Sequence, residues 1–138
     1  MTCVDARAEW ANSSRFPAEV EVLDEEPEDH LHAASPTQNE YIVVCTHAHD
    51  LDEALVRRLL ESDAKYLGRV GSRGKWARFQ KRFESRGLNP SLFERVRCPV
   101  GLDISAETPA EIAVSILAEL VASRRVRRDA PGESSGRS

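Results

Sequence analysis

Two short apolar runs joined by an amphipathic segment, within residues 41–75, constrain the fold more than any other part of this sequence. Residues 41–45 form a continuous apolar run, residues 65–70 form a second run, and leucines recur at helical spacing between them. A continuous apolar run is typical of a strand that is covered on both faces. The order strand, helix, strand therefore predicts a parallel βαβ unit.

Each of these two predicted strands is followed by a polar loop. Residues 46–52 read Thr-His-Ala-His-Asp-Leu-Asp, and residues 71–75 read Gly-Ser-Arg-Gly-Lys. The carboxyl ends of parallel strands meet at one edge of an open α/β sheet, and ligands bind at that edge. We therefore expect any site in this chain to be built from these two loops and from other loops that reach the same edge.

Further strands and helices are predicted on both sides of this unit. Thr108, Pro109 and Glu111 supply an N-cap, a proline at the first helical position and a capping-box glutamate. Asp50 and Glu53 predict a capping box for the helix between the two strands. Strands are predicted at residues 1–5, 19–24, 41–45, 65–70 and 98–102, and helices from 50, at 74–86 and 90–97, and from 108.

Three apolar stripes on these helices are expected to be buried, and they define the domain. The stripes comprise Leu51, Leu55, Val56, Leu59 and Leu60, then Trp76, Phe79 and Phe83, and finally Ile112, Ala113, Ile116, Leu117, Leu120 and Val121. Residues 1–126 are assigned to one α/β domain, and residues 127–138 to a disordered tail rich in Gly and Ser.

Composition limits the classes of function. The chain has 138 residues, of which 41% are hydrophobic and 30% charged, as in soluble globular proteins. The net charge of −4 argues against a nucleic-acid partner, and no apolar run approaches the about 20 residues of a membrane helix. We expect a cytoplasmic protein, because the first residues show no signal-peptide pattern. Cys3 and Cys45 are expected in the core, and Cys98 has no neighbours that mark a nucleophile.

Charge is distributed unevenly, which favours an anionic ligand for the middle of the chain. Residues 1–40 carry ten acidic side chains and two basic ones, whereas residues 69–86 carry seven basic side chains and one acidic one. Within the second range, residues 71–75 join a strand to a helix N-terminus, whose free N–H groups suit a phosphate or carboxylate. The Walker spacing is absent. The alternative is a tight turn followed by a solvated basic face that includes Arg78, Arg82 and Arg86.

The histidines of the first polar loop admit three interpretations. They could coordinate a divalent metal together with Asp50 and Asp52. Alternatively, His47 and His49 could hydrogen-bond a ligand at the strand ends. In the third interpretation the loop is structural, and Asp50 or Asp52 simply caps the helix. The same pattern opens metal-dependent hydrolases built on eight-stranded barrels, which need further ligands spread over about 250 residues. We therefore expect no bound metal.

Three blocks of sequence carry a family resemblance. They are Val-Cys-Thr-His-Ala-His-Asp-Leu-Asp at 44–52, Tyr-Leu-Gly-Arg-Val-Gly-Ser-Arg at 66–73, and Pro-Val-Gly-Leu-Asp-Ile-Ser-Ala-Glu-Thr-Pro at 99–109. In this order they resemble the C-terminal Rossmann domain of the XdhC/CoxI family. The resemblance implies a Rossmann-like, three-layer α/β domain with a mostly parallel sheet.

The resemblance also implies a function, which is that of an accessory, chaperone-like protein rather than an enzyme. It would bind molybdenum cofactor, a pterin with or without a joined nucleotide, for the maturation of xanthine dehydrogenase or a related molybdenum hydroxylase. The implied partners are that target enzyme, a sulfur donor and, for the intact family member, a second copy of the chain. Carried over by position, the cofactor-binding residues are Thr46, His47, His49, Asp50, Gly71, Ser72, Arg73, Gly101, Leu102, Asp103 and Glu107.

The sequence departs from the family pattern in two respects. It has no counterpart of the family's N-terminal domain, whose cysteine is proposed to handle cofactor sulfur, nor of the first Rossmann strand, its glycine-rich turn and the following helix. In the strand order 3-2-1-4-5 that strand lies between strands 2 and 4. The strand at 41–45 is therefore expected to be open on one side, closed by residues 2–5, or covered by another chain. Two other interpretations stay open: an NAD(P)-binding oxidoreductase in which Asp5 contacts a ribose, and a fragment without a ligand.

Overall fold

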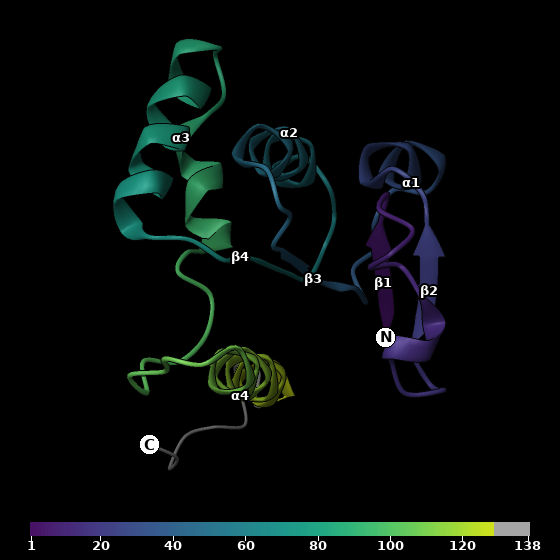
Figure 1. The fold of residues 1–138 in the computed structure, drawn as a ribbon. Coiled ribbons are helices and arrows are strands. Elements are labelled where there is room, and N and C mark those ends of the chain that lie inside the picture. Colours follow the sequence, from purple (N-terminus) through teal and green to yellow (C-terminus); the bar gives the residue numbers. More distant parts are fainter. Residues whose placement is uncertain (129–138) are drawn as a thin grey trace.

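The structure is a computed structural model that describes residues 1–128 (Figure 1). The strands are β1 (Thr2–Asp5), β2 (Glu21–Asp24), β3 (Tyr41–Val44), β4 (Tyr66–Arg69) and β5 (Val96–Arg97), and the helices are α1 (Pro27–Ala33), α2 (His49–Leu60), α3 (Arg73–Ser85) and α4 (Pro109–Arg128), with 3₁₀ turns at Ser13–Arg15 and Pro90–Arg95. Of the expected tail, residues 127 and 128 belong to α4, and the rest lies outside the described residues. In the described part of the chain, no helix is both long and apolar enough to cross a membrane.

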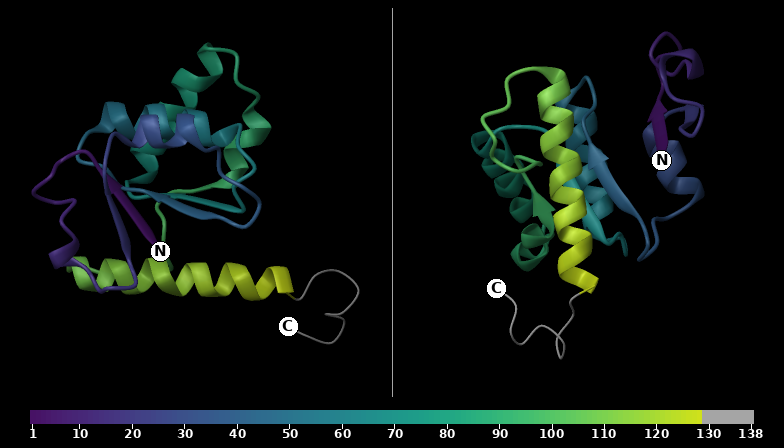
Figure 2. Two further views of the ribbon diagram at one scale, coloured as in Figure 1. Left: turned by 90° about the vertical axis from the view of Figure 1, so that its right-hand side faces the viewer. Right: turned by 90° about the horizontal axis from the view of Figure 1, so that it is seen from below.

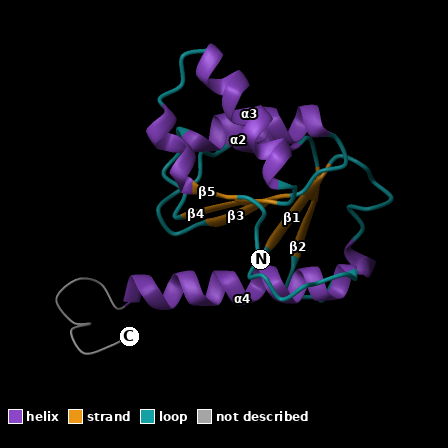
Figure 3. Cartoon of the chain, turned by 90° about the vertical axis from the view of Figure 1, so that its left-hand side faces the viewer, coloured by secondary structure: helices purple, strands orange, loops and turns teal. Residues whose placement is uncertain are grey.

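The strands form two separate parallel groups. β1 pairs with β2, and a second group has the order β3-β4-β5. Ile42 lies opposite Leu67, and Leu67 lies opposite Val96. Since α2 joins β3 to the parallel strand β4, the predicted βαβ unit is confirmed. Figures 2 and 3 show α1, α2 and α3 on one side of the strands and α4 on the other, which is a Rossmann-like, three-layer α/β arrangement.

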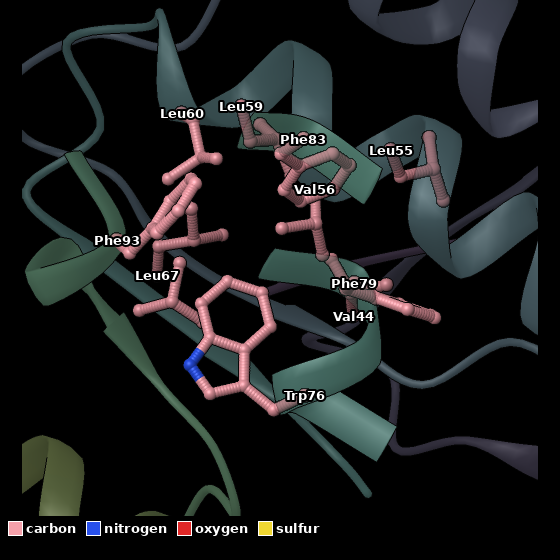
Figure 4. Packing of buried hydrophobic residues seen from close by; sticks show 11 residues of the cluster. Val44, Leu55, Val56, Leu59, Leu60, Leu67, Trp76, Phe79, Phe83 and Phe93 are labelled. Atoms are coloured by element: carbon pink, nitrogen blue, oxygen red, sulfur yellow. The ribbon is translucent and has the colours of Figure 1, made fainter. Parts of the chain in front are cut away.

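The hydrophobic core lies between the three-stranded group and the helices α2 and α3 (Figure 4). Trp76 and Phe83 of α3 pack edge-to-face with ring centroids 6.4 Å apart, and Trp76 meets Phe93 in the same way at 6.1 Å. Burial of each large apolar side chain contributes about 1.5–3 kcal/mol. The other core members are Val44, Leu55, Val56, Leu59, Leu60, Leu67, Phe79 and Val96. The predicted stripes on α2 and α3 are therefore confirmed, with Leu51 only partly buried.

The predicted burial of α4 is wrong, although its start is confirmed. Thr108 Oγ1 accepts a hydrogen bond from the Glu111 N–H at 3.1 Å, as a capping box requires. Further along the helix, however, Leu117 and Val121 are 50% and 42% exposed. The physical reason is that α4 packs on its own side of the strands, and no further layer formed by residues 1–128 covers it; Ser115 makes its buried contact instead.

Two local predictions are also wrong. Asp50 and Glu53 form no capping box, because α2 begins at His49 after Ala48 and has no side-chain cap. Glu53 pairs instead with Arg82 of α3 at 2.6 Å and with Arg86, which directly follows α3, at 3.7 Å. The last strand is Val96–Arg97 rather than 98–102, since Pro99 has no N–H to donate to a strand ladder.

Candidate functional site

A buried ion pair holds the loop after β3 against the end of β4. Arg69, the last residue of β4, and Asp52 of α2 have side chains 0% and 5% exposed, and Arg69 Nη2 lies 3.4 Å from Asp52 Oδ2. The other carboxylate oxygen accepts hydrogen bonds from the Thr46 N–H at 2.9 Å and the Thr46 hydroxyl at 2.6 Å. Asp52 therefore fixes the conformation of the first polar loop and does not cap α2.

The guanidinium group of Arg69 lies directly beneath the second polar loop. Its Cζ lies 4.1 Å from the ring centroid of Phe79, and a Cβ added to Gly71 would come within 2.4 Å of Arg69 Nη1. Glycine at position 71 is thus required for close approach of the loop backbone to a buried cation. Arg69 Nε is buried and has no hydrogen-bond partner among the described residues.

Cys98 completes the contacts under this loop. Its sulfur lies 3.9 Å from Arg69 Nη1 and donates to the Gly71 carbonyl at 3.5 Å. Partial burial raises the pKa of the Cys98 thiol, and the nearby Arg69 only offsets part of that rise. The Cys98 thiol therefore stays protonated at neutral pH and acts as a packing and hydrogen-bonding group.

The start of α3 is electropositive and open to solvent. Ser72 is the N-cap, and its Oγ accepts from the Lys75 N–H at 3.2 Å. Arg73, Gly74 and Lys75 are exposed, and residues 69–83 contain no acidic side chain. Free N–H groups, the positive end of the helix dipole and two cationic side chains therefore converge in one place.

The two polar loops meet at this point. His49 Nε2, at the start of α2, lies 3.3 Å from Lys75 Nζ, at the start of α3. His47 and Asp50 are exposed in the same loop. The structure thus brings His49 to Lys75 of the second polar loop, whereas the Thr46 side chain is held by Asp52.

The third predicted block has a different local role. Gly101 has φ +103°, and a Cβ there would lie 2.4 Å from Ser115 Oγ of α4. The Leu102 N–H donates to the Ser115 carbonyl at 3.1 Å, so this block anchors α4. Asp103 and Glu107 are exposed, and in the described residues no hydrogen bond or ion pair joins them to the first two loops.

Asp5, the residue expected to contact a ribose in the oxidoreductase interpretation, is already occupied. Arg7 donates to Asp5 from Nε at 3.1 Å and from Nη2 at 2.9 Å. This bidentate contact lowers the pKa of the Asp5 carboxyl. A ribose would have to displace a charge-assisted pair, so the geometry does not favour that interpretation.

Two further predictions can be compared with the structure, and one observation concerns the histidines of the first polar loop. Within residues 1–128, no group of three His, Cys, Asp or Glu side chains is arranged to hold a metal ion. The basic face of α3 is only partly solvated, because Arg82 and Arg86 pair with Glu53. The expected burial of Cys3 and Cys45 is wrong: Cys45 is exposed and Cys3 is half-buried.

Comparison with known proteins identifies the family. A family model described as the XdhC Rossmann domain matches residues 1–120. The chain belongs to the XdhC family. It is 34% identical over 121 residues to the uncharacterized protein YqeB of Escherichia coli, and 35% identical over 121 residues to a Bacillus subtilis protein described as a probable subunit of xanthine dehydrogenase.

This XdhC-family domain corresponds to only part of each relative. Each alignment covers 88% of this chain, but 19% of the Escherichia coli protein and 34% of the Bacillus subtilis protein. A crystal structure of a xanthine dehydrogenase from Bacillus halodurans matches 97% of this chain and 38% of its own with a TM-score of 0.79 and 28% identity. The Rossmann-like fold is therefore shared with an experimentally determined structure.

Proposed function

We propose that this domain binds molybdenum cofactor and acts as an accessory protein in the maturation of a xanthine dehydrogenase-type enzyme. The observation that carries the proposal is the cationic N-terminus of α3, which lies above the buried Arg69 and beside His49. Membership of the XdhC family supports the same assignment. The relative from Bacillus subtilis, described as a probable subunit of xanthine dehydrogenase, supports the choice of target enzyme.

The residues present fit the phosphate of a pterin cofactor. The N–H groups of Arg73 and Gly74 have no partner within the helix, since the first turn of any α-helix leaves its N–H groups free. Arg73 can add a bidentate contact to phosphate oxygens, and Lys75 can add a point charge. Because Gly71 has no side chain, the loop backbone lies close to Arg69, whose charge is paired with that of Asp52, so the attraction for an anion comes from Arg73, Lys75 and the start of α3.

The first polar loop would face the pterin from the neighbouring strand. His49 is exposed and its Nε2 is near Lys75, so it can exchange that contact for a pterin oxygen or nitrogen. Thr46 would act by shaping the loop rather than by donating to the cofactor, because both its N–H and its hydroxyl are bound to Asp52. His47, Asp50, Asp103 and Glu107 remain proposed ligands on their exposure alone. No catalytic residue is assigned.

The wider proposal also includes partners. The target enzyme would receive the cofactor, and a sulfur donor would act before that transfer. The proposal further includes a second copy of the chain as a partner and a nucleotide joined to the cofactor. The family resemblance alone supports these four points.

Paired arginine substitutions test the proposed site. Arg73→Ala removes a charge-assisted anion contact and should weaken cofactor binding by about tenfold to a hundredfold, the equivalent of roughly 1–3 kcal/mol. Arg78→Ala is the matched control, because Arg78 is exposed on the same helix and forms no ion pair among the described residues. It should change the dissociation constant less than about twofold, the scale of a solvated surface charge. The measurement is a titration of the purified chain with molybdenum cofactor.

Equal losses in the two variants would contradict the site, because the basic charge would then act only as a diffuse field. Arg82 is unsuitable as the control, since its ion pair with Glu53 joins α3 to α2. Inorganic phosphate should compete with the cofactor for the wild-type chain. It should compete less effectively for the Arg73→Ala variant.

A further inference from the structure

The two polar loops leave neighbouring strands side by side. Val44, the last residue of β3, lies opposite Arg69, the last residue of β4, and the Val70 N–H donates to the Val44 carbonyl at 3.0 Å. Among residues 1–128, no backbone hydrogen bond joins residues 45–50 to residues 71–75. The position of one loop relative to the other therefore depends on side chains.

The side chains of Asp52 and Arg69 together contact both loops. Asp52 Oδ1 accepts hydrogen bonds from the Thr46 N–H at 2.9 Å and from the Thr46 hydroxyl at 2.6 Å. That hydroxyl accepts from the Ala48 N–H at 3.2 Å, directly before α2. On the other side, Asp52 Oδ2 lies 3.4 Å from Arg69 Nη2, and the backbone at Gly71 rests on the same guanidinium group.

Cys98 supports the second polar loop next to Arg69. Its sulfur lies 3.9 Å from Arg69 Nη1 and donates to the Gly71 carbonyl at 3.5 Å. Gly71 directly precedes Ser72, the N-cap of α3. The position of the first turn of α3, and of its free N–H groups, therefore depends on the groups beneath Gly71.

Stability alone gives little reason for an ion pair in this place. The side chains of Arg69 and Asp52 are 0% and 5% exposed, and a buried ion pair can often be replaced by well-packed apolar side chains without loss of stability. Arg69 Nε is buried with no hydrogen-bond partner among the described residues, which adds to the cost. An apolar pair would fill the space but could not bind the N–H and hydroxyl of Thr46.

We propose that Asp52 and Arg69 are positioning residues for the cofactor site, an inference that rests on the proposed function. They hold the first polar loop, with His49, at a fixed distance from the start of α3. One cofactor can then contact His49 and Arg73 at the same time. Asp52 and Arg69 do not contact the cofactor themselves, because both side chains are buried beneath the loops.

An effect of position and an effect of charge have opposite signs in the variant Asp52→Asn. The substitution removes a negative charge near the site and leaves Arg69 without its neutralising partner. If the pair acted only through its electric field, an anion would bind more tightly. Positioning predicts weaker binding, because the asparagine amide has a single acceptor oxygen. In either orientation its NH₂ group faces a donor, which is the Thr46 N–H or Arg69.

The first experiment is a titration of the purified full chain and its Asp52→Asn variant with molybdenum cofactor and, separately, with inorganic phosphate. Both ligands should bind the variant about tenfold more weakly, the scale on which lost supporting hydrogen bonds weaken a metal site. Phosphate is the decisive probe, because it would contact only the start of α3. Asp52 is bonded to the other loop and reaches the start of α3 only through Arg69.

Thr46 allows a milder test that keeps the ion pair. Thr46→Val nearly preserves the shape of the side chain but removes the hydroxyl that bonds to Asp52 and Ala48. It should weaken cofactor binding by about threefold to tenfold, as expected for one lost hydrogen bond. Phosphate binding should change little, because the contact between Asp52 and Arg69 remains. Thr46→Ser keeps the hydroxyl and should restore cofactor binding.

A core variant separates position from stability. Leu60 is 0% exposed and ends α2, at the opposite end from His49. Leu60→Ala should lower the free energy of unfolding, because it leaves a cavity, yet it should bind cofactor and phosphate like the wild type. Urea unfolding measures the stability of each variant, and the titrations are made where circular dichroism shows a folded chain.

Four results would overturn the inference. Phosphate that binds Asp52→Asn as tightly as the wild type, or more tightly, would show that charge rather than position matters. Equal losses in Leu60→Ala and Asp52→Asn would assign the effect to stability. If Asp52→Asn does not fold, equal cofactor binding by Thr46→Val and Thr46→Ser decides against it. A wild-type chain that binds neither ligand would overturn the proposed function as well, whereas the first three results leave that function intact.

Discussion

Arg69 is the residue on which the geometry of the candidate site depends most. It contacts Asp52 of α2, the ring of Phe79 on α3 and the sulfur of Cys98. Asp52 in turn holds Thr46 in the first polar loop. A buried ion pair is costly to desolvate. Removing one of its two side chains leaves the other as an uncompensated buried charge. The pair therefore links the conformation of the two loops to the stability of the core.

The first prediction concerns this pair. Asp52→Ala should lower the free energy of unfolding by about 3–5 kcal/mol, because Arg69 remains charged and buried. In the double variant Asp52→Leu with Arg69→Met, the free energy of unfolding should fall by less than in Asp52→Ala alone, since no buried charge remains. Urea unfolding of the variants measures both quantities. If the double variant is at least as unstable as Asp52→Ala, the two side chains do not compensate each other as described.

At the scale of residues, the sequence predicted which residues lie at the site better than it predicted the contacts between them. Gly71, Arg73 and Lys75 were predicted because they form a turn from a strand into a helix N-terminus with basic side chains, which suits an anion. Arg69 and Asp52 were missed as a pair, since a charged residue in a sequence pattern normally indicates an exposed position. The available signal was an arginine between Leu67 and Val70, inside a predicted strand.

Among the elements, α4 depends on few contacts for its position. The Tyr66 hydroxyl of β4 donates a hydrogen bond to Glu119 of α4, and Gly101 allows the preceding loop to approach Ser115. Most of the apolar side chains of α4 are at least partly exposed. The Tyr66–Glu119 bond is thus a large part of what attaches this helix to the strands.

The second prediction tests that attachment by comparing two tyrosines. Tyr66→Phe should lower the free energy of unfolding by about 1.5 kcal/mol, the contribution of a hydrogen bond to a charged group. Tyr41→Phe is the control, because Tyr41 stacks on Tyr66 with a centroid distance of 6.0 Å and its hydroxyl is buried without a partner among the described residues. Its removal should be neutral or stabilising. Equal losses measured by urea unfolding would contradict the role of the Glu119 bond.

The difference in unfolding free energy between wild type and Tyr66→Phe should also depend on pH. Desolvation and the bond to Glu119 raise the pKa of Tyr66 in the folded chain, whereas in the unfolded chain it is about 10. The unfolded chain therefore loses the proton first, and the stability contributed by Tyr66 falls as pH rises above about 10. The gap in unfolding free energy between wild type and Tyr66→Phe should be constant near neutral pH and narrow above that value. A gap that widens there would contradict the assignment.

Element boundaries show what sequence periodicity can and cannot predict. The helices α2 and α3 were predicted with their buried faces because both pack against the group β3-β4-β5. The stripe on α4 has the same spacing, yet it is exposed, since burial depends on what lies opposite the helix rather than on the helix itself. The last strand was predicted at the wrong residues for a related reason. Val96 pairs with Leu67, and only the tertiary fold defines that register.

For the whole molecule, the unpaired edges of β1 and β3 and the exposed stripe on α4 have one common consequence. Unpaired edges and apolar surface favour association between chains. The stripe is formed by Val114, Leu117 and Val121, which are 58%, 50% and 42% exposed. Their spacing places them on one side of the helix. The isolated chain should therefore associate as its concentration rises.

The third prediction is that the apolar stripe drives much of this association. Leu117→Lys should reduce the average mass seen by analytical ultracentrifugation while changing the free energy of unfolding by no more than about 0.5 kcal/mol, as for most exposed positions. Ala122→Lys adds the same charge at another exposed position of α4 and should leave association nearly unchanged. Sulfate should strengthen the association of the wild-type chain, since it favours burial of apolar surface. If both lysine variants reduce association equally, net charge rather than the stripe controls it, and a chain that stays monomeric at every concentration would show that neither the stripe nor the open edges are adhesive.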